Sequence, residues 1–263
     1  GAEGGGEVII DIHAHLWGGQ YAENKAEIVR ACQRHGLTRC YISGLGAFQP
    51  DPEEIAELNR EVYRFQREEP GLIQGYAYVN PNHGNALAVL QRCVEEWGMA
   101  GMKLWVACYC DAPQVYPLVE QCIDYRIPVL LHTFHKRVGQ LPNESLATHV
   151  ARLAKRYPEA KLIMAHLGGN CYHGIKVVQA YPNVFVDFSG SMFRRGDLDY
   201  ACRLLGAERI LFGSDLPVAD PLVSLGQVEE ADLMEAEKEV ILHKNALALF
   251  ARRSGEVENE ERS

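Results

Sequence analysis

The chain has 263 residues, of which 47% are hydrophobic and 23% are charged. This composition excludes a disordered chain, and the charged residues along the whole sequence exclude a protein with several membrane spans. The 26 basic and 35 acidic residues give a net charge of -9, which opposes binding to a phosphate backbone, so neither nucleic acid nor a membrane is expected as a partner. The length suits one closed α/β barrel of about 250 residues or two smaller domains.

Both ends of the chain are expected to lie outside the folded part. Residues 1–6 are mostly glycine and contain no apolar stretch, so no signal peptide is predicted there. Residues 1–6 and about 252–263 are expected to be loose termini of one domain that spans residues 1–263. The eight cysteines lack the paired spacing of a zinc ribbon, which favours buried, reduced thiols and a cytoplasmic location.

Short apolar runs alternate with longer segments of helical spacing along the chain, a rhythm typical of βα units. Strands are expected at residues 8–12, 38–42, 72–79, 100–105, 128–132, 161–165, 184–188 and 209–213. The segments between them carry helix signals: after the capping sequence Asp51-Pro52-Glu53-Glu54, one apolar stripe is formed by Ile55, Leu58, Val62 and Phe65. Eight such units favour an α/β fold with a single closed (β/α)8 TIM barrel, and a distorted seven-stranded barrel is the alternative.

Histidines and an aspartate recur at the carboxyl ends of these strands, where the loops of a barrel form one shared mouth. The first strand ends in Asp11-Ile12-His13-Ala14-His15, and its two histidines face the same side because they are two residues apart. His132, His166 and Asp215 follow the fifth, sixth and eighth strands. Imidazole nitrogens and carboxylate oxygens suit a divalent metal, zinc first, with manganese, cobalt or iron as alternatives. Such an ion makes a bound water reactive near neutral pH.

Six motifs in chain order carry a resemblance to a known family. They are Asp11-Ile12-His13-Ala14-His15, Gly101-Met102-Lys103-Leu104, the strand that ends at His132, Ala165-His166-Leu167-Gly168-Gly169, Val186-Asp187-Phe188-Ser189-Gly190 and Phe212-Gly213-Ser214-Asp215-Leu216-Pro217. Together they resemble the amidohydrolase superfamily, and within it the amidohydrolase-2 (amidohydrolase-related) branch of TIM-barrel metal-dependent hydrolases. That branch also contains aminocarboxymuconate-semialdehyde decarboxylase and the resorcylate decarboxylases.

The resemblance implies a role for each polar residue at the mouth. Four of them would bind the metal: His13, His15, His132 and Asp215. Asp215 would also take the proton from the nucleophilic water and pass it to the leaving group. His166 would be either a ligand of a second metal or an acid/base group that orients water and substrate, so the catalytic pair would be Asp215 and His166.

Lys103 leaves three alternatives open. In relatives with two metals, a carboxylated lysine at this place bridges the ions, which would add a second metal. The ammonium group could instead pair with a substrate carboxylate, or with a neighbouring acid in a structural role.

Aromatic and basic residues follow several strand ends and predict a pocket for a small polar molecule. Together with Lys103, the candidate substrate-binding residues are Trp17, Trp105, His135, His173 and Arg194. Arg194 would bind a carboxylate through its planar fork. Asp187, at the end of the seventh strand, is expected to support the site from behind rather than to touch the substrate.

The leading hypothesis from these features is a metal-dependent hydrolase that uses a metal-activated water on an amide, ester or lactone bond of a small polar substrate. The alternative is a non-oxidative decarboxylase, a carbon–carbon lyase that acts on a small unsaturated or aromatic acid with the same ion. A third reading is a non-catalytic barrel that binds a metal or a ligand. The expected partner is a small molecule, and the resemblance implies a homodimer.

Overall fold

The computed structural model describes residues 7–190 and 194–251, so the termini predicted to be loose lie outside the described residues. Eight parallel strands follow one another in chain order around a barrel. They are β1 (Ile10–Trp17), β2 (Arg39–Leu45), β3 (Ile73–Tyr78), β4 (Gly101–Leu104), β5 (Val129–Leu131), β6 (Leu162–Met164), β7 (Val184–Asp187) and β8 (Ile210–Leu211). The first and last strands meet where the Ile12 N–H donates to the Phe212 carbonyl at 3.0 Å. The predicted (β/α)8 TIM barrel is therefore confirmed, and the seven-stranded alternative is wrong.

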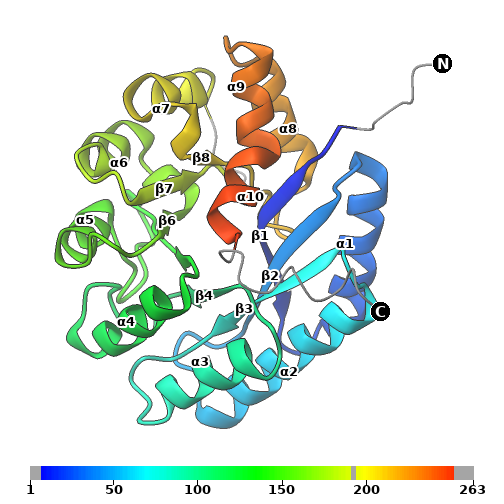
Figure 1. Ribbon diagram of the computed structural model, residues 1–263, viewed down its shortest axis with the longest axis vertical. Coiled ribbons are helices and arrows are strands. Elements are labelled where there is room, and N and C mark those ends of the chain that lie inside the picture. The colour runs from blue at the N-terminus through cyan, green and yellow to red at the C-terminus, as the bar shows by residue number, and fades with distance from the viewer. Residues whose placement is uncertain (1–6, 191–193, 252–263) are drawn as a thin grey trace, which may run out of the picture.

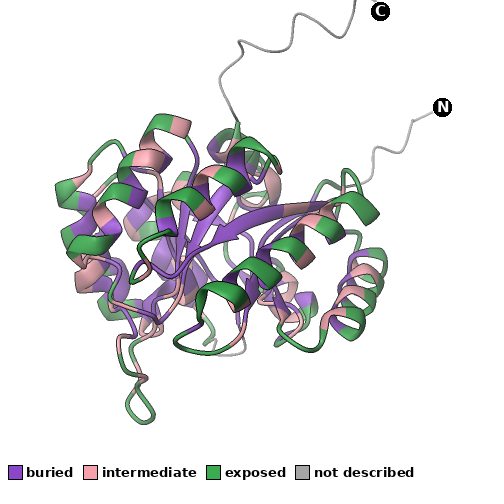
Figure 2. Cartoon of the chain, turned by 90° about the horizontal axis from the view of Figure 1, so that it is seen from below, coloured by how far each residue is buried: buried purple, intermediate pink, exposed green. Residues whose placement is uncertain are grey.

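Helices lie around the outside of the strands, as Figure 1 shows. They are α1 (Tyr21–His35), α2 (Pro52–Glu68), α3 (Ala86–Glu95), α4 (Tyr116–Tyr125), α5 (Ala147–Arg156), α6 (Cys171–Val178), α7 (Asp197–Leu205) and α8 (Pro221–Glu230), followed by α9 (Glu235–Glu239) and α10 (Asn245–Phe250). α2 begins as its sequence predicts, because the Asp51 carboxylate accepts the Glu54 N–H at 2.8 Å. The strands are buried and the outward faces of the helices are exposed (Figure 2), so the strands form the core.

Two strands are longer than the apolar runs that predicted them. β1 continues through both histidines to Trp17, and β2 continues to Leu45. The extension is held by pairing between the strands, since Leu16 lies opposite Gly44 and Trp17 lies opposite Leu45. His13 therefore lies within a strand and not at its end, which fixes its backbone on both sides.

The last helix closes the amino end of the barrel. Leu249 of α10 packs in one buried cluster with Ile10 and Tyr41, and the Phe250 ring stacks on the Tyr41 ring with centroids 3.9 Å apart. In the same layer, the Tyr76 hydroxyl donates to the Ile12 carbonyl at 2.6 Å. Because these side chains fill the amino end, a ligand enters the barrel from the carboxyl end of the strands.

Two further observations concern the cysteines and the apolar character of the helices. Each of the eight cysteines is a free thiol, and all except Cys108 are buried. Within residues 7–190 and 194–251, none of the helices combines the length and the apolar character that a membrane span requires.

Candidate active site

The two histidines of β1 point their Nε2 atoms at one position inside the barrel. These atoms lie 3.0 Å apart. The Nδ1 of His13 donates to the Asp187 Oδ2 at 2.8 Å, and the Nδ1 of His15 contacts the Ser43 hydroxyl at 3.1 Å. Because a carboxylate can only accept, the Nδ1 of neutral His13 carries the proton and its Nε2 carries a lone pair.

Asp215 brings a carboxylate to the same position from the segment after β8. Its Oδ1 lies 2.9 Å from the His15 Nε2 and 3.5 Å from the His13 Nε2. The residue adopts a left-handed backbone with φ of 71°, which its N–H supports by donating to the His13 carbonyl at 2.8 Å. A left-handed residue other than glycine costs about 1–2 kcal/mol, so placing this carboxylate beside the histidines lowers the stability of the fold.

His166 enters the site on a left-handed turn that follows β6. Its φ is 58°, and the next residue, Leu167, has a φ of 49°. Its N–H donates to the Asp187 Oδ1 at 3.1 Å, and its Nδ1 donates to the Ser189 carbonyl at 2.9 Å. The ring is thereby held from behind, and its Nε2 carries the lone pair when it is neutral. Gly169 completes the turn, since a Cβ there would lie 2.6 Å from the His135 backbone nitrogen.

These side chains suit a divalent cation. One ligand atom from each of His13, His166 and Asp215 lies within 4.8 Å of the other two. Burial and the neighbouring Lys103 lower the pKa of His13 to about 3, and burial lowers the pKa of His15, so both rings are neutral. Burial raises the pKa of Asp215, but the contact with His15 and the nearby His166 outweigh burial and hold this pKa below its usual range. Neutral imidazoles and an ionised carboxylate are the forms that bind metal.

His132 lies beside this cluster. Its ring centroid is 5.4 Å from that of His166, and among the described residues its buried Nε2 has no hydrogen-bond partner. The nearest carboxylate is that of Glu144, 3.7 Å away. Burial lowers the pKa of His132 to about 4, so this ring too is neutral, and it lines the cavity described below. Sequence reasoning did not find Glu144, which lies in a loop without a recognisable pattern.

Lys103 of β4 lies fully buried beside the histidines, with its Nζ 3.5 Å from the His13 Nε2. Burial lowers its pKa to about 8, although the charges of Asp215 and Asp187 act in the opposite direction. No carboxylate in residues 7–190 or 194–251 lies within ion-pair distance of this ammonium group. The geometry therefore favours a partner that enters from outside over a structural ion pair.

A cavity of about 210 Å³ opens above these groups. Its lining consists of His15, Trp17, Leu45, Lys103, Trp105, His132, Lys136, Leu141, His166, Asp215 and Val218. One wall is aromatic: the ring centroid of Trp105 lies 5.8 Å from that of Trp17. Phe48, which is outside the lining, packs against Trp105 with ring centroids 5.3 Å apart. Two of the residues predicted to bind substrate, Trp17 and Trp105, thus lie together in one wall, whereas sequence reasoning missed Lys136.

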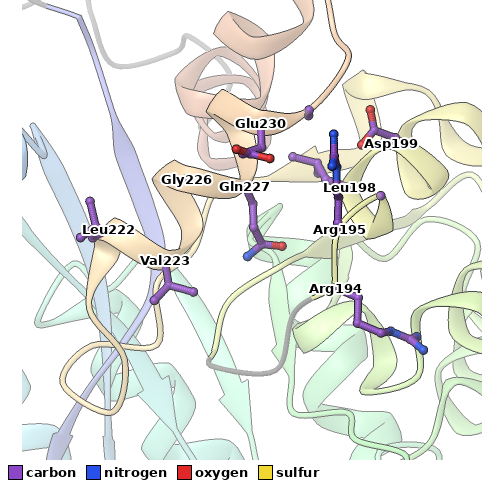
Figure 3. A pocket seen from close by; sticks show the side chains of 11 residues that line it. Arg194, Arg195, Leu198, Asp199, Leu222, Val223, Gly226, Gln227 and Glu230 are labelled. Atoms are coloured by element: carbon purple, nitrogen blue, oxygen red, sulfur yellow. The ribbon is translucent and has the colours of Figure 1, made fainter.

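The structure does not bring the other three predicted substrate contacts to this cavity. The rings of His135 and His173 meet in an edge-to-face arrangement with centroids 5.7 Å apart, outside the lining. The Arg194 guanidinium lies over the Tyr172 ring at 5.2 Å. Arg194 instead lines a second cavity of about 320 Å³ between α7 and α8, which shares no lining residue with the first (Figure 3).

Known proteins resemble this chain over most of its length. The gamma-resorcylate decarboxylase of Polaromonas sp. (strain JS666) is 25% identical in an alignment 288 positions long, gaps included, that covers 84% of this chain and 86% of that protein. The crystal structure of a dihydroxybenzoic acid decarboxylase from Polaromonas sp. JS666, with manganese and the inhibitor 2-nitroresorcinol, has a TM-score of 0.77 at 21% identity and covers 93% of this chain and 97% of that chain. The structure of a 5-carboxyvanillate decarboxylase from Novosphingobium aromaticivorans, with manganese, has a TM-score of 0.75 at 13% identity. It covers 93% of this chain and 97% of that chain.

These relatives correct the predicted reaction and support the predicted divalent metal. They are decarboxylases, so our leading hypothesis of a hydrolase acting on amide, ester or lactone bonds is wrong, and the decarboxylase alternative is the better supported one. A divalent metal is supported, but the two structures hold manganese, so zinc is not confirmed. Both structures also hold a small aromatic molecule, in agreement with the expected class of partner.

The sequence model of the amidohydrolase family matches residues 10–252, which is nearly the whole described chain. That match covers all eight strands and the histidine and aspartate cluster described above. This chain is therefore an enzyme that belongs to the amidohydrolase family.

Proposed function

We propose that this enzyme is a metal-dependent, non-oxidative decarboxylase of a small aromatic acid. The observation that supports the proposal most is the position of the histidine and aspartate cluster, which forms the floor of a cavity with an aromatic wall. The relationship to a gamma-resorcylate decarboxylase over 84% of the chain points in the same direction. In the reaction the ring carboxylate leaves as CO₂ and a proton takes its place on the ring carbon, so no oxidant or water is consumed.

The proposed ligands of the cation are His13, His15 and Asp215, whose ligand atoms lie within 3.5 Å of one another. His132 stays a predicted ligand, because its Nε2 is buried and has no other hydrogen-bond partner in the described chain. When bound, a divalent cation supplies positive charge that attracts the oxygen atoms of an acid and stabilises negative charge that develops on them.

The protein itself holds the acid in two ways. Trp17 and Trp105 offer ring faces and edges against which an aromatic ring packs. The Lys103 ammonium group, which has no carboxylate partner among the described residues, pairs with an oxygen of the carboxylate or of a neighbouring hydroxyl group. This arrangement turns the carbon–carboxylate bond towards the floor of the cavity.

His166 is the proposed proton carrier. Its Nδ1 donates to the Ser189 carbonyl, so a proton taken up by the ring is held on Nε2, at the wall of the cavity. Asp215 is the poorer donor because its pKa is held below the usual range of a carboxylic acid. The His166 Nε2 therefore takes up a proton from solvent and delivers it to the ring carbon that loses CO₂.

The test is to load the protein with Mn²⁺ and to offer it a panel of hydroxybenzoates and hydroxybenzenedicarboxylates. We expect release of CO₂ and of the matching phenol in equal amounts, loss of both after treatment with a chelator, and recovery when Mn²⁺ is restored. The Asp215→Asn variant is expected to lose the activity. Asp124→Asn, which changes an exposed carboxylate on α4, is the matched control and is expected to keep it. If the Mn²⁺-loaded protein releases no CO₂ from any acid of the panel, the proposal is wrong.

The remaining predictions on the setting of the enzyme are less specific. We propose that Mn²⁺ supports higher activity than Zn²⁺, which the same assay with each metal tests. A homodimer, one domain over residues 1–263 and a cytoplasmic location stay predictions. Light scattering measures the first, limited proteolysis the second and cell fractionation the third.

A further inference from the structure

A second lysine lines the cavity, and a buried carboxylate holds it in place. The Lys136 Nζ lies 2.8 Å from Oε1 and 2.9 Å from Oε2 of Glu144. The Glu144 side chain is fully buried, whereas the Lys136 side chain is 26% exposed. A buried carboxylate that loses its cation is strongly destabilising, so the pair is maintained. Lys136 thus has a fixed position, unlike most surface lysines.

The loop that carries Lys136 is built to hold this position. Its ends meet where the Phe134 N–H donates to the Ser145 carbonyl at 3.0 Å. Inside the loop, the Gln140 side chain accepts the Lys136 N–H at 2.9 Å, and donates to the Phe134 carbonyl at 2.7 Å and to the Glu144 Oε1 at 3.1 Å. A loop with close ends and its own internal hydrogen bonds is compact, so the ammonium group is presented at the cavity wall without a helix or strand.

The ammonium group keeps a donor for a ligand. Lysine has three N–H donors, and the two Glu144 oxygens account for two of them. The same cavity contains Lys103 on its floor, which the proposed function assigns to the reacting end of the acid. The cavity therefore has two cationic groups in different places, at the floor and at the wall.

We infer that Lys136 selects aromatic acids with a second negatively charged substituent, which it binds at a distance from the carboxylate that is lost. This inference rests on the proposed function for the nature of the substrate. Glu144 acts as a positioning residue: it directs the Lys136 ammonium group and does not touch the substrate. The substrate class is thus an aromatic dianion, such as a benzenedicarboxylate, rather than a benzoate with neutral substituents.

The test measures binding, so that its result does not depend on turnover. Benzoate, benzene-1,3-dicarboxylate and benzene-1,4-dicarboxylate are titrated by calorimetry into the Mn²⁺-loaded protein. We expect at least one dicarboxylate to bind about tenfold more tightly than benzoate, the gain of one charge-assisted hydrogen bond. In Lys136→Met this preference is expected to disappear while the affinity for benzoate stays within about threefold of the wild-type value. Lys136→Arg is expected to keep a preference.

Two further variants separate selection from a structural role. Lys136→Met leaves the Glu144 carboxylate buried without its cation, so the double variant Lys136→Met/Glu144→Gln removes that charge and is expected to fold and to lack the preference as well. Lys155→Met, which removes an exposed lysine from α5, is the matched control and is expected to retain it. The inference is overturned if the wild-type protein has no preference, if the preference persists without Lys136, or if the double variant loses benzoate affinity equally. Failure of the decarboxylase proposal would instead be seen as the absence of CO₂ release.

Discussion

The hydrogen bond between the His13 Nδ1 and the Asp187 carboxylate allows a sharp prediction for Asp187→Asn. The Asp187 Oδ1 accepts from the His166 N–H at 3.1 Å, the Ser189 N–H at 3.0 Å and the Ser189 hydroxyl at 2.6 Å. Since all three are donors, the oxygen of the new amide must take that place, and its NH₂ group must face the His13 Nδ1. That Nδ1 would then have to accept, so the proton of the ring would move to Nε2, the atom that faces the cation.

The change of tautomer sets the size of the effect. Losing the hydrogen-bond partner of a metal-binding histidine lowers metal affinity by about 10- to 100-fold, or about 1.4–2.7 kcal/mol. The substitution changes neither the volume nor the shape of a fully buried side chain, so the barrel itself is expected to remain folded. The loss should therefore be seen in metal binding before it is seen in stability.

The assay is a competition between the protein and a fluorescent chelator for Mn²⁺, with the fold monitored by circular dichroism. The Kd of Asp187→Asn for Mn²⁺ is expected to rise about 10- to 100-fold. Asp124→Asn, on the exposed face of α4, is expected to bind Mn²⁺ like the wild-type protein. A folded Asp187→Asn variant with a Kd within threefold of the wild-type value would refute the tautomer argument.

Three other predictions test the wall, the closed end and the packing of the barrel. Trp105→Ala removes the centre of the aromatic wall and should raise the KM for an aromatic acid about tenfold with kcat within about threefold, and an equal fall in kcat would contradict this. Phe250→Ala removes the stack on Tyr41 and should cost about 2 kcal/mol, lowering Tm in calorimetry by about 4–8 °C, while Mn²⁺ affinity stays unchanged. Gly44→Ala would place a Cβ 2.8 Å from the Leu58 Cβ and should cost about 1–3 kcal/mol in urea unfolding, so wild-type stability would speak against this close contact of β2 and α2.

The barrel could be predicted because its strands are covered on both faces. A strand such as β5 is apolar at every position and is fully buried, which produces an uninterrupted run in the sequence. The same rule made the prediction for β1 too short, because His13 and His15 interrupt the apolar run while the strand continues to Trp17. Polar residues that face the centre of a barrel look like a loop in sequence, although strand pairing keeps them extended.

The site divides in the same way between residues that come directly after a strand and residues that only the fold brings near. His166 and Asp215 were found because each comes after an apolar run. Glu144, which lies near His132, carries no such signal because its role depends on a contact between distant segments. Ser43 directly follows the predicted strand at residues 38–42, but a serine there does not indicate its contact with the His15 Nδ1. Arg194 shows the opposite error, since a basic residue after a strand was expected at the mouth but lies over the Tyr172 ring.

The prediction of a hydrolase was wrong because the residues that the sequence identifies do not distinguish hydrolysis from decarboxylation. The proposed metal ligands of β1 and of the turn after β8 would hold a cation at one point, and its charge could stabilise a developing oxyanion in either hydrolysis or decarboxylation. The two reactions differ in the surface that the substrate meets above that point. Here this surface includes Trp17, Trp105 and Lys136, which belong to loops or strand ends without periodic patterning. The choice of reaction therefore has to be sought in the mouth loops, where an aromatic wall and a held ammonium group favour an aromatic acid over an uncharged amide or lactone.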